Sequence, residues 1–279
     1  MQDVHSLTSH TNAGVERLKS DGHLDKLRRW LSPSDPSTNL NAARGKRLEG
    51  TGNWFINSDA FSQWKSGSPQ HLWLHGLAGC GKTVLTSTIL DHLHSAPTDS
   101  CVCLDFFFDF RDKDKQHLDN LLRSLASQLY ARCAESRQEL DSLFASCENG
   151  QMQPTIELLS KTVHLMMQRP QKVRIVLDAL DECAARSELL EWMKTLAGPA
   201  LKNVHLIATS RREEELESGL QWIDKENTIP LQGDLIDNDI RSYTKARLQG
   251  PGAFQKRWGE KLDVLEEIET VIGEKSKGM

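Results

Sequence analysis

The chain has 279 residues, with 34 lysines and arginines against 39 aspartates and glutamates, and a formal net charge of −5 at pH 7. This length is sufficient for one large domain with a smaller annex. The slight acidic excess, without a long basic run, disfavours a nucleic-acid interface or a membrane-binding surface. No apolar run is long enough to cross a bilayer, and the six cysteines contain no C-x-x-C pair. We therefore expect a soluble, cytoplasmic protein with reduced thiols and no zinc site.

The first 66 residues predict a small helical annex. Apolar residues at helical spacing indicate a helix over residues 23–31, and a turn-rich connector separates it from a short helix over residues 41–48. Ser58 or Asp59 is expected to cap the next helix. The aromatic residues of this region are expected to pack the annex against the main domain.

Residues 71–83, HLWLHGLAGCGKT, join a short apolar strand to a glycine-rich turn. The segment from Gly76 to Thr83 matches G-x-x-x-x-G-K-[ST] at every position, and a helical pattern follows. The glycines let the backbone approach an anion closely, and the loop and helix N–H groups point positive dipole ends at phosphate. Lys82 is expected to reach the β- and γ-phosphates, and the Thr83 hydroxyl to hold Mg²⁺. The flanking strand and helix argue against the alternative, a glycine turn that carries a lysine by chance.

This pattern predicts a nucleoside triphosphate as ligand. The residues expected to contact it are Gly76, Leu77, Ala78, Gly79, Cys80, Gly81, Lys82, Thr83 and Val84.

From this loop onward, apolar runs alternate with helical patterns, which is typical of a parallel sheet flanked by helices. The runs predict strands over residues 71–75, 101–110, 173–180, 204–209 and 228–231. Helices are predicted between them over residues 117–132, 136–147, 155–168 and 187–197. We expect an α/β fold of the P-loop NTPase type, with a five-stranded parallel sheet in which the magnesium-binding strand does not follow the loop strand in sequence.

The C-terminal residues predict helices that belong to another unit. A helical pattern covers residues 234–248, Gly250-Pro251-Gly252 interrupts it, and a second pattern covers residues 261–272. We therefore expect a nucleotide-binding core over residues 67–233 and the start of a helical domain over residues 234–279.

Three acidic residues follow the predicted strand VRIVLD. Asp178 ends the strand and is expected to position Mg²⁺ beside the glycine-rich loop. Asp181 and Glu182 come three and four residues later, where a carboxylate could polarise an attacking water. Asp181 is the first candidate for this base and Glu182 the second. Solvated loop acids are the alternative for both.

Arg211 ends the fourth predicted strand, in the sequence Thr209-Ser210-Arg211. In a parallel sheet of this kind that position faces the γ-phosphate, so Arg211 is a candidate sensor of that group. A surface arginine at the start of an acidic helix is an equally good interpretation, and both stay open.

Together these residues resemble the NACHT branch of the signal-transduction (STAND) P-loop ATPases and GTPases. The likeness is to the nephrocystin-like N-terminal domain of fungal NOD-like receptor proteins. The matching pieces are Leu31–Asn39, Glu49–Phe55, Leu72–Thr83, Ile175–Cys183, Ala208–Arg211 and Asp239–Leu248. The resemblance implies a slow, Mg²⁺-dependent NTPase that acts as a conformational switch in signal transduction and fungal innate immunity. It implies ADP or GDP at rest, exchange for ATP or GTP, and self-association, and it favours Asp181 over Glu182.

Proteins of this family normally continue into a winged-helix unit and repeats. The resemblance therefore implies that this chain is truncated, a fragment or a minimal member. A non-hydrolysing nucleotide-binding adaptor, or a remnant without switch activity, is the alternative function. A small-molecule phosphotransferase is disfavoured because no arginine-rich substrate lid follows the loop. The choice between ATP and GTP stays open, and base contacts are expected from the annex around residues 50–52.

Overall fold

The computed structural model describes residues 22–95, 101–249, 264, 267–268 and 270–271. The helix predicted over residues 261–272 lies mostly outside this part of the chain. Within it, no helix is both long enough and apolar enough to span a membrane.

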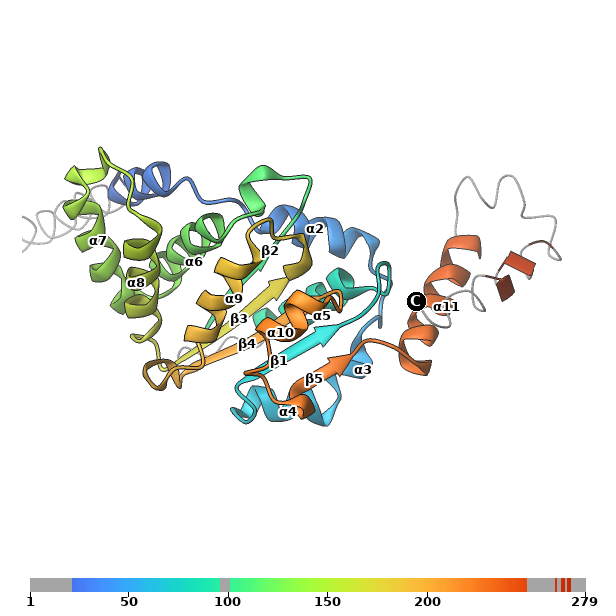
Figure 1. Cartoon of the computed structure of the whole chain (residues 1–279). Helices are drawn as coiled ribbons and strands as arrows, with labels where there is room; N and C mark the ends of the chain where they lie inside the picture. The colour runs from blue at the N-terminus through green and yellow to red at the C-terminus, as the bar shows by residue number, and fades with distance from the viewer. Residues whose placement is uncertain (1–21, 96–100, 250–263, 265–266, 269, 272–279) are drawn as a thin grey trace, which may run out of the picture.

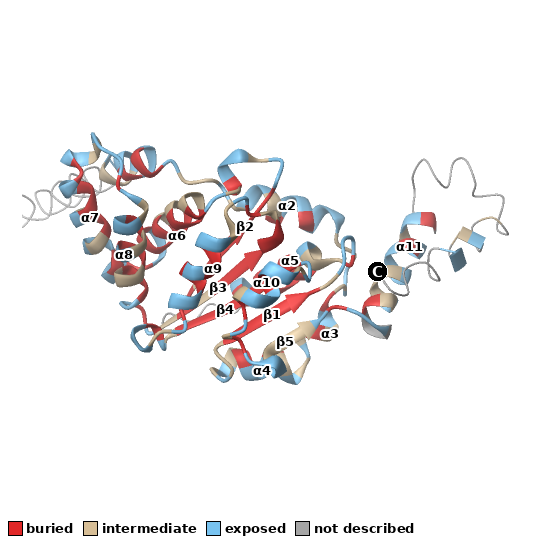
Figure 2. Cartoon of the chain, in the orientation of Figure 1, coloured by how far each residue is buried: buried red, intermediate tan, exposed pale blue. Residues whose placement is uncertain are grey.

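Five parallel strands form one sheet in the order β2-β3-β4-β1-β5, which Figure 1 shows as a twisted layer between helices. The strands are β1 (His71–His75), β2 (Cys101–Phe107), β3 (Lys172–Asp178), β4 (Val204–Ser210) and β5 (Thr228–Pro230). The four longer strands are mostly buried, as parallel strands covered on both faces should be (Figure 2). The predicted five-stranded parallel sheet is confirmed, with β4 lying between β1 and β3.

Helices cover both faces of this sheet. They are a helix over residues 22–31, α2 (Ser37–Lys46), α3 (Asn53–Ile56), α4 (Asp59–Ser66), α5 (Lys82–Ser95), α6 (Leu118–Arg132), α7 (Arg137–Ser146), α8 (Ile156–Met167), α9 (Arg186–Thr195) and α10 (Glu214–Gly219). A further helix, α11 (Asp234–Gln249), lies beyond the β5 edge of the sheet (Figure 1). One apolar cluster joins α6 to α10 to the strand face that carries Leu104. A second joins α2 to α5 to the face that carries Leu72 and Leu74. Successive strand residues enter opposite clusters because side chains alternate across a strand.

Three strands end earlier than predicted, and of these β5 is shorter by a single residue, ending at Pro230 rather than residue 231. β3 ends at Asp178 rather than residue 180, because Ala179 takes a left-handed conformation with φ 59° and turns the chain. The Ala179 N–H donates to Thr209 Oγ1 across 3.1 Å, which fixes this turn. β2 ends at Phe107 rather than residue 110. There the Asp109 carboxylate accepts from the Arg111 N–H at 3.0 Å and closes a local turn.

The N-terminal helices differ from the prediction in two places: the short helix α3 (Asn53–Ile56) was not predicted, and α2 is displaced. α2 begins at Ser37, inside the predicted connector, and ends at Lys46. Asp35 starts it by accepting hydrogen bonds from both the N–H and the hydroxyl of Ser37, at 2.8 and 2.9 Å. Ser58 caps α4 as predicted, because its hydroxyl accepts from the Phe61 N–H at 3.2 Å.

The aromatic residues of the annex pack into the main core, also as expected. Phe55, Phe61 and Trp64 belong to the same cluster as β1 and α5, whereas Trp30 belongs to the cluster on the other sheet face.

Candidate functional site

The glycine-rich loop connects β1 to α5 at the carboxyl edge of the sheet. Gly79 and Gly81 have φ of 83° and 91°, a region that other residues rarely adopt. A Cβ on Gly76 would lie 2.6 Å from Cys80 Sγ and 3.0 Å from the backbone of Leu231, so only glycine fits there. The sequence therefore forms a tight loop whose backbone N–H groups stay free of side-chain obstruction.

Lys82 lies at the first position of α5. Its Nζ donates to the carbonyl oxygens of Gly76 and Leu77 at 2.7 and 2.8 Å. The ammonium group thus lies over the glycine-rich loop. It places a positive charge where a phosphate group would bind.

Asp178 lies beside the loop and is 1% exposed. Its Oδ2 accepts from Thr83 Oγ1 at 2.7 Å, and its Oδ1 accepts from Thr86 Oγ1 at 2.7 Å and Thr209 Oγ1 at 2.6 Å. Burial raises the pKa of Asp178, while these hydroxyls and Lys82 oppose that change. The hydroxyl of Thr83 and the carboxylate of Asp178 are in direct contact, which is the donor pair that Mg²⁺ would need.

A hydroxyl and one carboxylate suit Mg²⁺, which takes oxygen ligands and usually keeps several waters or phosphate oxygens. Among the described residues, no group of three or more His, Cys, Asp or Glu side chains could hold a metal ion. The residues present therefore fit a cation that a bound nucleotide would help to coordinate.

These groups surround a cavity of about 330 Å³, called here the phosphate pocket. Ten predicted site residues line it: Ala78, Gly79, Gly81, Lys82, Thr83, Val84, Asp178, Asp181, Glu182 and Arg211. Three others lie outside it. Gly76 and Leu77 line a cavity beside β5, and Cys80 is buried against an apolar pocket on the far side of the loop.

Asp181 and Arg211 are bound to each other in this pocket. Asp181 Oδ1 accepts from the backbone N–H of Arg211 at 2.9 Å, and Oδ2 pairs with its Nε at 3.1 Å. The Asp181 side chain is 4% exposed, so it is not a solvated loop acid. The Arg211 side chain is 48% exposed, yet its guanidinium group is held at the pocket by this ion pair.

Glu182 points to another partner. Its carboxylate accepts from the Phe110 N–H at 3.1 Å. Burial raises the pKa of Glu182, and the nearby carboxylates of Asp181, Asp109 and Asp178 raise it further. Glu182 is thus engaged with the loop that follows β2.

Two segments reach the phosphate pocket that the sequence did not single out. Asn39 and Lys46 come from α2, and Asp109 and Arg111 come from the loop after β2. Asn39 Nδ2 donates to Asp109 Oδ2 at 3.1 Å, and Arg111 Nε donates to Asp109 Oδ1 at 3.0 Å. Because Asn39 and Asp109 are 70 residues apart in the chain, their sequence positions carry no signal of this contact.

An apolar pocket of about 540 Å³ adjoins the other side of the glycine-rich loop. The turn before α3, the end of α2 and α11 line it together with Gly79, Cys80 and Gly81. Asp239 on α11 accepts from the Gly52 N–H at 2.9 Å and from Trp54 Nε1 at 3.1 Å. Of the region expected to contact a base, residues 51 and 52 line this pocket and residue 50 does not.

Comparison with known proteins gives one family match and one curated relative. The family model described as "Nephrocystin 3, N-terminal" matches residues 50–211. Vegetative incompatibility protein HET-E-1 of Podospora anserina is 27% identical over 250 residues, covering 84% of this chain and 18% of that protein. The chain therefore spans less than a fifth of the length of this relative.

Solved structures show weaker likenesses. The Walker-type ATPase PABY2304 of Pyrococcus abyssi has a TM-score of 0.45 and 14% identity, covering 73% of this chain and 60% of that one. Cdc6p of Pyrobaculum aerophilum has a TM-score of 0.44 and 14% identity, covering 79% and 52% respectively.

Proposed function

The chain belongs to the Nephrocystin 3, N-terminal family, as a nucleotide-binding P-loop NTPase domain of the NACHT type, and from this premise we propose that it is a Mg²⁺-dependent switch. The switch hydrolyses ATP or GTP slowly and signals through its conformation. The hydrogen bond between Thr83 and Asp178, at the floor of a pocket that also receives Lys82, is the observation that carries this proposal.

The proposed binding mode follows from the loop geometry. Phosphate oxygens would replace the carbonyls of Gly76 and Leu77 as acceptors for Lys82 Nζ, because a charged acceptor forms the stronger hydrogen bond. Thr83 and Asp178 would hold Mg²⁺, which would neutralise phosphate charge when bound. The purine would lie in the apolar pocket across the loop, against Trp54.

The ion pair between Asp181 and Arg211 provides a response to the γ-phosphate. The guanidinium group of Arg211 would turn from Asp181 to a γ-phosphate oxygen, where the opposite charge is greater. This would release a carboxylate oxygen of Asp181 to accept the proton of an attacking water. Arg211 is then the sensor and Asp181 the base, with Glu182 as the alternative base.

Other parts of the proposal rest on family likeness. We propose an annex over residues 1–66, a core over 67–233 and the start of a helical domain over 234–279. ADP or GDP would occupy the site at rest, and copies would self-associate when triphosphate binds. Cytoplasmic signalling in fungal immunity is the proposed setting.

Replacement of Lys82 tests the site. Lys82→Ala is expected to weaken binding of both Mg²⁺-ATP and Mg²⁺-GTP at least about a hundredfold, because it removes the charge at the loop. Isothermal titration calorimetry measures this, and Lys161→Ala on the exposed face of α8 is the matched control. Unchanged affinity in Lys82→Ala would refute nucleotide binding in this loop.

A non-hydrolysing adaptor is the second candidate. The observation that favours it is the closed pairing of Asp181 with Arg211, which leaves neither group free. Nucleotide binding without any phosphate release by the unmodified chain would support the adaptor against the switch.

A further inference from the structure

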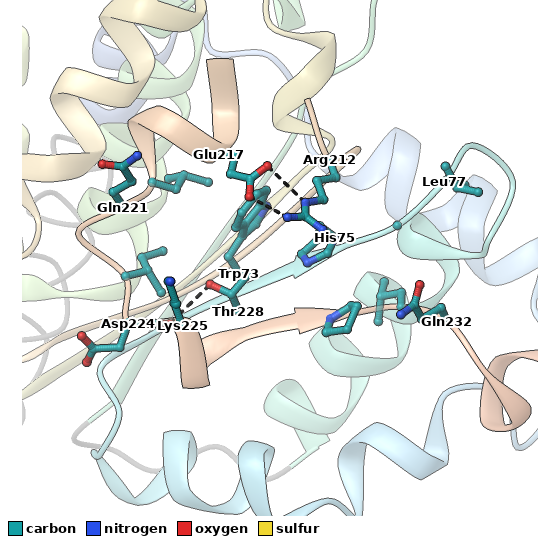
Figure 3. Close-up of a pocket in the computed structure, with 15 residues that line it drawn as sticks. Trp73, His75, Leu77, Arg212, Glu217, Gln221, Asp224, Lys225, Thr228 and Gln232 are labelled. Atoms are coloured by element: carbon teal, nitrogen blue, oxygen red, sulfur yellow. Dashed lines mark hydrogen bonds and ion pairs between the residues drawn. The ribbon is translucent and has the colours of Figure 1, made fainter. Parts of the chain in front are cut away.

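A larger cavity, of about 1000 Å³, lies beside β1 and β5 on the sheet face that carries α10 (Figure 3). We call it the β5 cavity. It shares no lining residue with the phosphate pocket and only Leu231 with the apolar pocket. Trp73 and His75 form part of its floor, Thr228 and Pro230 lie along β5, and the short helix α10 forms one wall. Such a volume is at the upper end of cavities that hold drug-sized molecules.

His75 is the buried polar side chain in the lining of this cavity. It is 8% exposed and lines the cavity, yet its ring makes no hydrogen bond with any residue that the structure describes. Its one ring contact is with Trp73, at 4.9 Å between centroids. Burial lowers the pKa of His75, and the cations of Arg212 and Lys82 lower it further, so the ring is neutral near pH 7. A neutral imidazole offers one donor and one acceptor, and both are available to a molecule in the cavity.

The charges around the cavity cancel. Arg212 Nη2 pairs with Glu217 Oε1 at 2.6 Å, and Figure 3 shows this pair above His75. At the other end Asp224 and Lys225 bring one charge of each sign. Such a lining gives no net field that would favour a phosphate or another anion.

The remaining lining combines apolar side chains with the uncharged polar side chains of Gln221, Thr228 and Gln232. Leu220, Ile223, Pro230 and Leu231 face the cavity, and Leu77 reaches it with 53% of its surface exposed. A ligand that fits would therefore be uncharged, with an apolar part for these side chains and a polar group that can hydrogen-bond to a neutral imidazole.

We propose that the β5 cavity is a regulatory site for an uncharged, amphipathic small molecule that hydrogen-bonds to His75. Its occupant would be sensed at the nucleotide site through two short connections. His75 immediately precedes Gly76, and Arg212 immediately follows Arg211, which is paired with Asp181. This regulatory effect rests on the proposed nucleotide binding, whereas the cavity and its ligand class do not.

Two fluorescent probes with the same aromatic body test the ligand class. N-phenyl-1-naphthylamine is uncharged and carries one N–H donor, and 1-anilinonaphthalene-8-sulfonate adds a negative charge. The full chain is titrated with each probe while the apolar pocket is filled with saturating Mg²⁺-ADP. The uncharged probe is expected to bind saturably, one molecule per chain, and at least about tenfold more tightly than the sulfonate. Equal or tighter binding of the sulfonate would overturn the assignment to an uncharged ligand.

Substitutions locate the probe. Thr228→Trp fills the cavity from β5 and is expected to weaken binding of the uncharged probe at least about tenfold, by steric exclusion. Gln232→Trp serves the same purpose if Thr228→Trp does not fold. Leu158→Trp, at an exposed position on α8, is the control that should leave binding unchanged. His75→Leu is expected to weaken it about fivefold, through loss of one hydrogen bond. Probe affinity that Thr228→Trp or Gln232→Trp leaves unchanged would refute the site.

The regulatory effect is measured as the change that the bound probe causes in ADP affinity. Saturating the chain with the uncharged probe should change its ADP affinity by about fivefold or more, and Thr228→Trp should abolish that change. A probe that binds in the β5 cavity without altering ADP affinity would refute the regulatory role. If ADP does not bind at all, the proposed function fails, while the effect of Thr228→Trp on probe binding still tests the cavity.

Discussion

Asp181 holds Arg211 through both carboxylate oxygens, one to the backbone N–H and one to the side chain. Glu182, the adjacent acid, is engaged instead with the N–H of Phe110. The two candidate bases therefore differ in what would release them. Only the contacts of Asp181 include a cation that a γ-phosphate would attract away.

This difference predicts that substitutions of the two acids will affect hydrolysis to different extents. Asp181→Asn is expected to reduce hydrolysis by about 10²- to 10⁴-fold, the usual contribution of a general base, while ADP binding is kept. Glu182→Gln should reduce it by less than about tenfold, because that side chain mainly supports the loop after β2. Phosphate release measures the rates, and Lys82→Ala gives the background rate without nucleotide bound in the loop. A larger loss in Glu182→Gln than in Asp181→Asn would transfer the role of base to Glu182.

At the scale of elements, α11 is joined to the turn before α3 by one side chain. Asp239 accepts from the Gly52 N–H and from Trp54 Nε1, although the residues are more than 180 positions apart. Burial raises the pKa of Asp239, and these two hydrogen bonds oppose that change. The contact closes one side of the apolar pocket, so a change that loosens α11 should also weaken binding in the pocket.

Asp239→Ala is expected to loosen α11 and to weaken nucleotide binding about tenfold or more, because hydrogen bonds to a charged acceptor each contribute about 1.5–3 kcal/mol. Amide hydrogen exchange over α11 and calorimetry with ADP measure the two effects. Asp237→Ala, on the same helix and without a side-chain partner among the described residues, is the matched control. Faster exchange in both variants alike would show that Asp239 has no special role.

At the scale of the whole molecule, two buried histidines begin adjacent central strands. His71 on β1 packs against Trp222 at 5.1 Å, and neither of its ring nitrogens has a hydrogen-bond partner. His205 on β4 packs against Trp64, and its Nδ1 also lacks a partner. Burial lowers the pKa of each to about 4. The charge of His205 lowers the pKa of His71 further, and the charges of Lys172 and Arg174 lower that of His205 further.

These pKa values predict loss of stability in mild acid. The unfolded chain binds protons at these histidines near pH 6.5, and the folded chain does so only near pH 4. The free energy of unfolding should thus be unaffected above about pH 6.5, fall as the pH drops toward 4, and then level off. At pH 5 the loss is on the order of 2 kcal/mol for each histidine, and so about 4 kcal/mol for the two together. Urea unfolding at pH 7.5 and 5 measures it. The double variant His71→Phe, His205→Phe should show a smaller difference, and an equal difference would contradict this origin.

Much of the site could be predicted because its parts are contiguous in the chain. The loop from Gly76 to Thr83 and the strand that ends at Asp178 can each be recognised alone. Thr86 and Thr209 could not be predicted. A threonine in a helix or strand has no distinguishing pattern until the carboxylate it contacts has been located, and that carboxylate lies on another strand.

The sequence by itself determined the α/β class, the five strands, the glycine-rich loop and the identity of the acids after β3, since each depends on residues close together in the chain. Only the tertiary structure decided that Asp181 holds Arg211, that α2 and the loop after β2 enter the phosphate pocket, and that α11 closes the apolar pocket. Those contacts join residues about 30 to 190 positions apart. They follow from which strands lie side by side and from the packing of helices on both faces, and no local pattern encodes either.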